Sequence, residues 1–377
     1  MTTNTSAGAR LLAEVGSTAE IAARYAGDAD RDRVLHPDVA QALVGAGFAR
    51  HFVPTEYCGT AGTFTVLARA LIEVGTACAS AAWCGMIFAT SSRMAGFLPA
   101  EGRHEIWADS PDVPIAAALV PNGSVPVRGH GGWRLSGQWR YLSGVDFAHW
   151  ALLCATPDFP GDRENWFFAV PSDDFSIQDT WHTVGMRGTG SNTLLLDDVF
   201  VPDHRCFPQR TLLRGVDDAV AAPCYRIPLL GAHPPLFAAP TLGAARMGVA
   251  AWTEMTGRAR TSAGPAATRT SSQLALTRST SDLDAAQLLL ERATATADSG
   301  ALDDLLVARN VRDATAAAEH VVAAVERVFR SGGMRAQTEQ GPVQRAWRDV
   351  HTATSHAVLD IECSSQLFAR SVWRWGD

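Results

Sequence analysis

The chain has 377 residues, of which 47% are hydrophobic and 19% charged, and its net charge is −7. This is the composition of a folded protein with an ordinary core, and the negative charge argues against binding to nucleic acid or to an anionic membrane. All 32 basic residues are arginines. A chain without lysine can form neither a lysine Schiff base nor the lysine-dependent P-loop of a nucleotide hydrolase.

The cysteines and the N-terminus indicate the compartment. Seven cysteines are present, an odd number, and no two have the Cys-x-x-Cys spacing of a zinc or redox site. The first ten residues lack the apolar stretch of a secretory signal peptide. Residues 74–92 are uncharged but rich in Gly, Ser and Thr, which favours a core helix over a membrane span. We therefore expect a cytoplasmic protein with free thiols, no metal site and no membrane segment.

Helical and β patterns follow one another along the chain. Residues 38–43, 63–74 and 80–88 show the apolar spacing of helices. From residue 113 to 201 the pattern changes to short β runs, at 115–120, 133–142, 150–155, 166–170 and 194–201. Several strands without intervening helices favour an antiparallel β domain.

A proline-rich connector, which contains Pro223, Pro228, Pro234, Pro235 and Pro240, separates the β runs from a last helical part. Helices are predicted over 242–256, 281–297, 302–330 and from Pro342 to about Val372, with a mobile loop at 261–272. The sequence thus predicts an α+β protein. Its parts are an N-terminal helical domain (1–110), a central antiparallel β domain (111–215) and a C-terminal four-helix bundle (216–377).

Two segments of the predicted β domain carry chemistry-bearing residues. Strand alternation places Trp133, Leu135, Trp139, Tyr141 and Ser143 on one face, where they line either a flat aromatic ligand or, as the pattern alone favours, a packing face. Residues 181–191 have the spacing Gly-x-x-Gly-x-Gly without a βαβ context. Such a segment is either a close backbone approach to a cofactor or a simple glycine-rich turn.

A third segment lies on the last predicted helix. Helical spacing places Arg345, Asp349, Thr352, His356 and Asp360 on one stripe, whereas His351 points about 140° away. A lone helical histidine is more often structural. Because Asp360 lies one turn and Asp349 two turns from His356 and could fix its tautomer, we predict that His356, and not His351, is catalytic.

Together these segments resemble the acyl-CoA dehydrogenase fold, and most closely its flavin-dependent monooxygenase branch, the oxygenase components of two-component hydroxylases. The motifs that carry the resemblance are Phe52-Val-Pro-x-x-Tyr57, Gly132-Trp-x-Leu-Ser-Gly-x-Trp-x-Tyr-x-Ser-Gly144, Gly185-Met-Arg-Gly-Thr-Gly-Ser191 with Asp198-Val-Phe-Val-Pro202, Leu242-Gly-Ala-Ala-Arg246, and Arg348-Asp349 with His356. They span nearly the whole chain.

The resemblance implies a flavin between the β domain and the bundle. Ser143 matches a hydroxyl near flavin N5, and His356 matches the histidine over the ring. Arg187, Thr189 and Ser191 match the loop beside the ring or the substrate, and we add Trp139 and Tyr141 as cofactor-binding residues from the strand pattern. Arg260 matches an arginine that meets cofactor phosphates, often in a neighbouring subunit, although Ala263 replaces the aromatic residue of the dehydrogenases.

The implied function is hydroxylation of an aromatic or polyketide-like small molecule. O₂ and reduced flavin (FADH2 or FMNH2) would react through a C4a-hydroperoxyflavin, with Ser143, His356 and Asp360 as the catalytic residues. A separate reductase would supply the flavin, and the assembly would be a homotetramer. An N-oxygenase of an amine or amino sugar, a dehydrogenase and a non-catalytic scaffold are the alternatives. The dehydrogenase is weakened because Ala357 replaces the glutamate of the Tyr-Glu-Gly motif, and alanine cannot abstract a proton.

Overall fold

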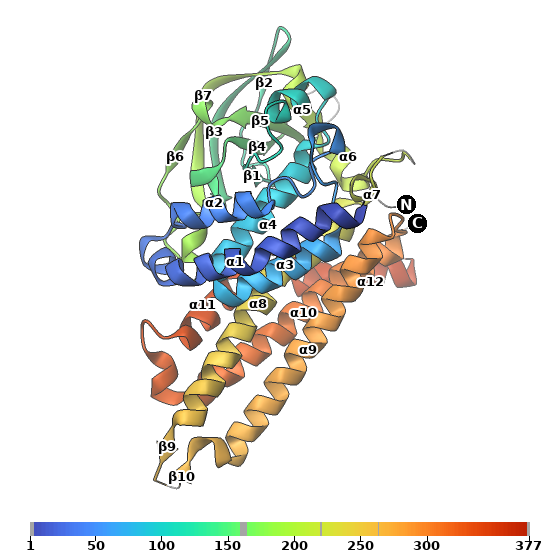
Figure 1. Ribbon diagram of the computed structural model, residues 1–377. Helices are drawn as coiled ribbons and strands as arrows, with labels where there is room; N and C mark the ends of the chain where they lie inside the picture. Colours follow the sequence, from blue (N-terminus) through green and yellow to red (C-terminus); the bar gives the residue numbers. More distant parts are fainter. Residues whose placement is uncertain (1–3, 159–163, 219–220, 263, 375–377) are drawn as a thin grey trace.

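A β domain stands on an elongated set of helices in the computed structural model, which describes residues 4–158, 164–218, 221–262 and 264–374 (Figure 1). The N-terminal helices are α1 (Asn4–Asp32), α2 (Pro37–Ala46), α3 (Phe64–Ala77), α4 (Ala79–Ala95) and α5 (Ala100–Trp107). α2, α3 and α4 confirm the predicted helices, whereas α1 and α5 were not predicted. The buried stripe of α1 contains mostly alanine, namely Leu11, Val15, Ala19, Ala22, Ala26 and Ala29, and so gives a weak periodic signal.

The β domain consists of two four-stranded sheets. One has the order β1 (Ile115–Ala118), β4 (Trp150–Ala155), β5 (Trp166–Pro171), β8 (Cys206–Pro208). The other has the order β2 (Val127–Gly129), β3 (Gly132–Leu142), β7 (Asn192–Pro202), β6 (Ser176–Gln178). The predicted antiparallel arrangement is confirmed for the other described pairs of these sheets, but β1 and β4 run parallel.

The two sheets pack face to face over a shared apolar core. Side chains from β3, β4, β5 and β7 meet there, among them Trp139, Leu153, Phe168 and Leu194. Trp139 is fully buried, and its indole Nε1–H donates to the carbonyl of Cys154 at 2.8 Å. A buried indole needs such a partner, since an unpaired buried donor is costly.

The C-terminal helices are α8 (Leu229–Arg258), α9 (Thr270–Asp298), α10 (Asp304–Ser331), α11 (Pro342–Thr354) and α12 (Ile361–Trp373), preceded by the short α6 (Gln209–Arg214) and α7 (Pro223–Arg226). The predicted proline-rich connector is wrong in its second half, because α8 contains Pro234, Pro235 and Pro240. Pro235 offers no N–H to the carbonyl of Gly231. Asn310 on α10 replaces that donor, because its Nδ2 lies 2.8 Å from the Gly231 carbonyl oxygen. The neighbouring helix thus supplies the hydrogen bond that Pro235 cannot make.

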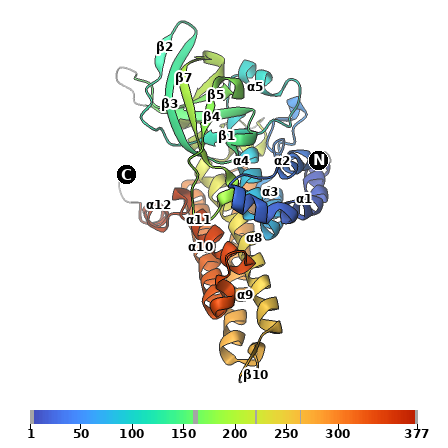
Figure 2. The ribbon, with the colours of Figure 1, turned by 90° about the vertical axis from the view of Figure 1, so that its left-hand side faces the viewer.

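Two further expectations for this region are wrong. The single helix predicted from Pro342 to Val372 is broken: α11 ends at Thr354, a 3-10 turn covers Ala357–Leu359, and Asp360 caps α12. The predicted loop 261–272 contains a small hairpin, β9 (Arg260–Thr261) with β10 (Gly264–Pro265), and the first turn of α9. Figures 1 and 2 show this hairpin at the end of the bundle farthest from the β domain.

The N-terminal helices and the bundle share one hydrophobic core. α3 and α8 cross backbone to backbone: a Cβ on Gly243 would lie 2.3 Å from the Ile72 carbonyl oxygen, so only glycine fits at this crossing. Because the N-terminal helices and the bundle share this core, the packing does not separate them, and the domain boundaries at residues 110 and 215 stay a prediction. Within the described ranges, no helix combines the length and the apolarity that crossing a membrane requires.

Candidate active site

Three buried hydroxyls and an indole form a chain of hydrogen bonds where the β domain meets α4. The Nε1–H of Trp83 on α4 donates to Ser143 Oγ at 3.0 Å, and Ser143 Oγ lies 2.7 Å from Ser191 Oγ. Ser191 Oγ lies 2.7 Å from Thr189 Oγ1, which donates to the carbonyl of Met186 at 2.9 Å. We call these four side chains the hydroxyl relay. The structure thus brings together three residues that the sequence placed at the flavin, and adds Trp83.

The predicted aromatic row on β3 is wrong beyond Trp139. A β-bulge between Trp139 and Leu142 shifts the register, and Tyr141 has a φ of +67°, a strained value for a bulky side chain. As a result Trp139 stays in the β core, whereas Tyr141 is turned outward and is 69% exposed. Trp139 therefore has the packing role that the pattern alone favoured, and Tyr141 faces Trp181 with ring centroids 6.1 Å apart.

The loop that carries Thr189 and Ser191 is fastened to two helices. Arg187 Nε donates to the Asp30 carbonyl at the end of α1, at 2.6 Å, and Arg348 on α11 pairs with the Asp30 carboxylate at 2.8 Å. Arg348 also donates to the Val184 carbonyl. A Cβ on Gly185 would lie 2.2 Å from the Arg348 carbonyl oxygen, so the loop touches the backbone of α11. Arg187 is thus engaged in holding the loop.

Asp349 supplies the deepest of these contacts. Its carboxylate accepts the N–H of Met186 at 2.6 Å, directly before the relay residues. The residue is buried, and the loss of hydration raises the pKa of its carboxyl from 3.8 to about 6. The hydrogen bond from Met186 opposes this shift but does not cancel it.

His356 lies on the other side of Trp83 from the relay. Because α11 has ended, His356 precedes the 3-10 turn at Ala357–Leu359, and its ring packs on Trp83 (centroids 5.8 Å apart) and on Phe237 of α8 (4.7 Å). The residue as a whole is exposed, yet protein atoms crowd the imidazole, and this desolvation lowers its pKa to about 4. The ring is therefore neutral at pH 7.

The tautomer of His356 follows from its backbone contact. The N–H of Val358 lies 3.2 Å from His356 Nδ1. An N–H can only donate, so Nδ1 accepts, and the proton of the neutral ring is on Nε2. His356 thus presents an N–H donor to its surroundings.

Asp360 does not orient His356, contrary to the prediction. The break between α11 and α12 removes the common helical stripe, and the exposed Asp360 carboxylate instead accepts the N–H of Cys363 at 2.7 Å as the cap of α12. This hydrogen bond lowers the pKa of the Asp360 carboxyl. His351 lies on α11 with Nε2 3.5 Å from Glu326 and its ring 4.5 Å from that of Trp347, in the bundle.

Arg260 is far from the relay within one chain, because it lies in the β9–β10 hairpin at the tip of the bundle (Figure 2). A cavity of about 670 Å³ there is lined by Arg258, Arg260 and Arg335, together with Glu254 and apolar residues. Arg258 also pairs with Glu254 at 2.5 Å. The tip therefore carries three arginines, and within one chain they do not reach the relay.

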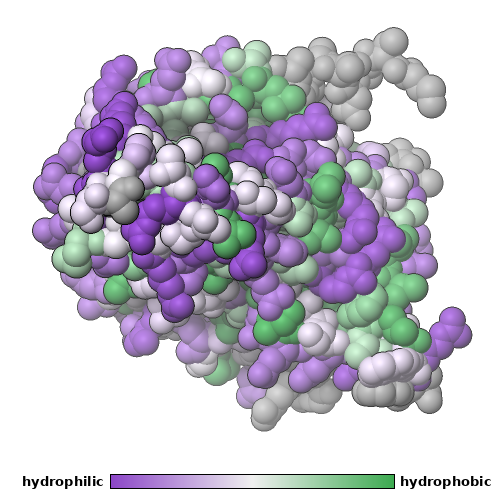
Figure 3. All heavy atoms as spheres, turned by 90° about the horizontal axis from the view of Figure 1, so that it is seen from below, coloured by the Kyte–Doolittle hydropathy of each residue, from purple (hydrophilic) through white to green (hydrophobic). Residues whose placement is uncertain are grey.

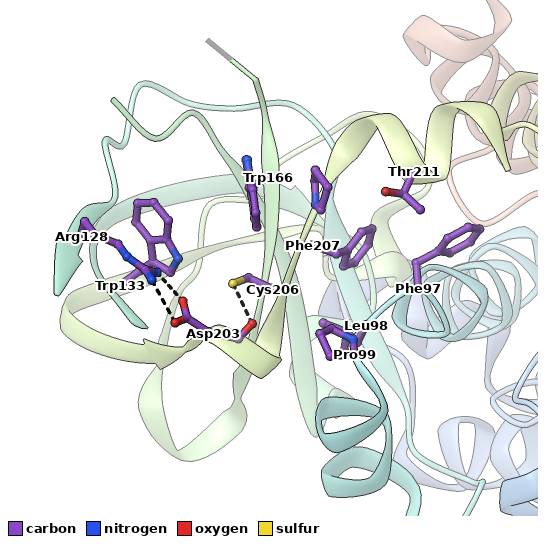
Figure 4. A pocket seen from close by; sticks show the side chains of 11 residues that line it. Phe97, Leu98, Pro99, Arg128, Trp133, Trp166, Asp203, Cys206, Phe207 and Thr211 are labelled. Carbon is purple, nitrogen blue, oxygen red and sulfur yellow. Dashed lines mark hydrogen bonds and ion pairs between the residues drawn. The ribbon is translucent and has the colours of Figure 1, made fainter. Parts of the chain in front are cut away.

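A separate cavity of about 590 Å³ opens beside the β domain (Figure 4). Its wall includes Phe97, Trp133, Trp166 and Phe207, with the ion pair of Arg128 and Asp203 at one side. Trp133 lies at the opposite end of β3 from Ser143. None of the predicted site residues lines this cavity. The described residues also contain no cluster of three or more His, Cys, Asp or Glu side chains that could hold a metal ion.

Comparison with known proteins identifies the family. Residues 236–361 match the family model described as acyl-CoA dehydrogenase, C-terminal domain. The FADH(2)-dependent resorcinol hydroxylase, oxygenase component, of Rhizobium sp. (strain MTP-10005) is 30% identical over 96% of this chain and 94% of its own length. The chain belongs to the flavin-dependent monooxygenases with the acyl-CoA dehydrogenase fold.

Other members of this monooxygenase family are similar to this chain in sequence and in structure. The oxygenase subunit HsaA of Rhodococcus jostii (strain RHA1) is 30% identical over 88% of this chain and 89% of its own. The structure of XiaF from Streptomyces sp., in complex with FADH2 and glycerol, superposes with a TM-score of 0.91 and 27% identity, covering 99% of this chain and 97% of that one. The predicted α+β fold and the resemblance are thereby confirmed.

The site residues of this family member fit a flavin. The strained backbone at Tyr141 keeps an aromatic side chain exposed two residues before the buried Ser143, and a flat ring system would cover it. Ser143 is 6% exposed and is the least buried of the three hydroxyl residues of the relay. An aromatic side chain close in sequence to this serine suits the isoalloxazine ring with its polar edge.

Trp83 is the residue that sequence reasoning missed. It lies in a helix that is buried throughout and is rich in small residues, between Ala82 and Cys84. A tryptophan among small residues was a possible signal, but nothing local shows that its N–H meets a serine 60 positions away.

The buried carboxyl of Asp349 yields a prediction of pH dependence. The pKa of its carboxyl is raised on folding, so the native state binds the proton more tightly than the unfolded chain. The contribution of Asp349 to the unfolding free energy is therefore greatest below about pH 4 and is lost as the pH rises through about 6. Asp349→Asn keeps an acceptor for Met186 but cannot titrate. We expect the unfolding free energy of the wild type to fall relative to this variant by up to about 1.4 kcal/mol per pH unit.

Urea unfolding of both proteins at pH 4, 5, 6 and 7 measures this difference. Asp360→Asn is the control, because the Asp360 carboxyl is exposed and its pKa is lowered. A constant difference between the wild type and Asp349→Asn over this range would contradict the prediction.

Proposed function

We propose that this family member is the oxygenase component of a two-component hydroxylase that acts on a phenol-like aromatic molecule in the cytoplasm. The main observation is that Trp83 joins two groups with separate tasks: its N–H bonds Ser143 of the relay, and its ring packs on His356. Support also comes from the relatives, since the resorcinol hydroxylase component and the p-hydroxyphenylacetate 3-hydroxylase component are both named for phenols.

In this proposal the chain divides the work between the two groups. When bound, reduced flavin supplies two electrons and activates O₂, so that one oxygen atom reaches the substrate. Ser143 would hydrogen-bond the flavin at N5, and Tyr141 would cover the ring. His356 would donate its Nε2–H to the oxygen of a substrate that is bound as its phenolate, after the phenol proton has been lost to solvent. The phenolate charge increases the electron density of the ring carbon that is oxidised. Trp83 and Phe237, whose ring centroids are 5.2 Å apart, would give this space apolar walls.

A dehydrogenase is the weaker proposal. Abstraction of a proton next to a carbonyl needs a positioned base. The position that carries the glutamate in such dehydrogenases is Ala357, and the neighbouring His356 has a neutral ring whose Nδ1 is already occupied by Val358. An oxygenase does not need a carboxylate there.

The function is tested by supplying reduced FMN or FAD from a separate reductase with NADH, in air, to a panel of phenols. Hydroxylated product that carries one atom from ¹⁸O₂ supports the proposal. Oxidation of a primary amine included in the panel would indicate N-oxygenation instead. Oxidation of an acyl-CoA in the presence of oxidised flavin would indicate a dehydrogenase. Consumption of O₂ that yields only H₂O₂ with every phenol would count against hydroxylation.

His356 yields a prediction in the same assay. His356→Ala should reduce product formation by about 10²-fold, the usual loss when a positioned hydrogen-bond donor to an oxyanion is removed. His356→Gln should retain more activity, because its amide N–H₂ still donates. His351→Ala, a change in the bundle, should be near neutral. Since the His356 pKa is about 4, this residue should add no inflection to the rate between pH 5.5 and 8. Equal losses from His351→Ala and His356→Ala would refute the assignment.

We infer that the active assembly is a homotetramer in which the bundle tip of one protomer reaches the flavin of another. Arg260 and its neighbours Arg258 and Arg335 suit flavin phosphates, and within one chain the β9–β10 hairpin that carries Arg260 lies far from the β domain. Apolar patches interrupt the hydrophilic surface seen from the tip (Figure 3), and α9 carries the exposed Leu274, Leu276 and Leu288. Such surface suits burial against another copy.

The assembly prediction has two measurements. Light scattering should give about four times the 40.2 kDa chain mass. Arg260→Ala should weaken reduced-flavin binding about tenfold to a hundredfold, the worth of a charged hydrogen bond, whereas Arg278→Ala, an exposed arginine of α9, should not. A particle of 40.2 kDa would refute the shared site.

A further inference from the structure

The cavity beside the β domain is lined mainly by aromatic rings, which come from separate parts of the fold (Figure 4). Trp133 on β3 and Trp166 on β5 lie toward one end, with ring centroids 6.3 Å apart. Phe207 on β8 and Phe97, which follows α4, lie toward the other end, with centroids 6.1 Å apart and ring planes at 23°. The cavity volume of about 590 Å³ is typical of small-molecule sites.

The core of the β domain holds two of these rings in place. Phe207 stacks on Phe167 at a centroid distance of 5.3 Å, and Trp133 packs edge-on against Phe168 at 6.0 Å. Trp133 and Phe207 are each 3% exposed. Because regular strands and core contacts fix these walls, a ligand would not have to order them, and little affinity is lost on binding.

One ion pair supplies the charge in this aromatic cavity. Arg128 Nη2 donates to Asp203 Oδ2 at 3.0 Å, and the guanidinium carbon lies 4.8 Å from the centroid of the Trp133 ring. The other described residues of the lining carry no charge, since burial raises the pKa of the Cys206 thiol to about 12 and keeps it protonated. A ligand with a net charge would therefore meet a like charge beside every opposite one.

We propose that this cavity binds a neutral, flat aromatic molecule with one hydroxyl group, an uncharged phenol, at a site separate from the flavin site. The rings of the wall can contact an aromatic ligand by face or edge. The ligand hydroxyl can donate to the Asp203 carboxylate and accept from Arg128, whereas a carboxylate or an ammonium group satisfies only one of the two. Neither the hydroxyl relay nor His356 lines the cavity, so this inference does not depend on the proposed function.

The experiment uses three probes with the same ring system and different charge. They are 2-naphthol, 2-naphthoate and 2-naphthylmethylammonium, titrated at pH 7 into the full chain without flavin by isothermal calorimetry. Thr211 on α6 also lines the cavity, and Thr211→Trp fills it. The binding that this variant loses belongs to the cavity and not to the flavin site. Thr211→Ser adds no volume and is the matched control.

We expect the wild type to bind one 2-naphthol per chain in the cavity, about threefold to fivefold more tightly than either charged probe, the scale of a half-exposed charge. Thr211→Trp should weaken this binding at least tenfold, whereas Thr211→Ser and His356→Ala should leave it unchanged. Asp203→Asn leaves Arg128 without its carboxylate and should move the preference to 2-naphthoate. Arg128→Gln should move it to the ammonium probe.

The control for the charge changes is the exposed ion pair of Arg134 and Asp198, which are 2.7 Å apart and outside the cavity. Arg134→Gln and Asp198→Asn should leave all three dissociation constants unchanged. Binding of 2-naphthol that Thr211→Trp does not weaken overturns the inference, as does a wild type that binds 2-naphthoate equally well. A cavity covered by another copy of the chain would bind no probe, which overturns it too.

If circular dichroism shows that Thr211→Trp is unfolded, the changed preference of Asp203→Asn decides. Failure of these titrations leaves the hydroxylation assay with ¹⁸O₂ untouched. Conversely, a protein that hydroxylates no phenol but binds 2-naphthol in the cavity defeats the proposed function and supports this site.

Discussion

The contact between the Met186 N–H and the buried carboxylate of Asp349 determines the geometry of the site. Met186 has a φ of +53°, so the chain turns sharply there, and its carbonyl ends the relay while its N–H is held by α11. The turn places Thr189 and Ser191 against the end of β3. Without the clamp from α11, the glycine-rich segment would have the freedom of an ordinary loop, and the two 2.7 Å contacts of Ser191 with Ser143 and Thr189 could not persist.

The same clamp couples the helical bundle to the β domain. Arg348 and Asp349 are neighbours on α11, yet their side chains reach different targets, Asp30 on α1 and the Met186 backbone. Three parts of the chain that are far apart in sequence therefore meet at one short loop. Trp83 adds a fourth, because α4 lies between the relay and the segment with His356. The site is thus a property of the packed helices and not of the β domain alone.

Sequence patterns were sufficient for the order of the architecture and for the long periodic elements. They failed where a single backbone angle, or a single missing N–H donor, determines the local secondary structure. Period-two alternation cannot anticipate the bulge at Tyr141, which reverses the faces of the last residues of β3. Proline was read as a helix breaker, but Asn310, 75 positions after Pro235, supplies the missing donor. Trp83 and Asp349 act through long-range contacts that no local pattern encodes.

The break after α11, which the sequence pattern did not predict, changes the chemical role of His356. On a continuous helix the ring of His356 would share a stripe with Asp349 and Asp360, and a carboxylate partner would favour its charged form. The break instead exposes Asp360 as a helix cap and directs the Val358 N–H to Nδ1. Together with the apolar walls of Trp83 and Phe237, this keeps the ring neutral with its proton on Nε2. The interruption of the helix therefore converts a histidine that the sequence pairs with Asp360 into a hydrogen-bond donor, the form that a phenolate requires.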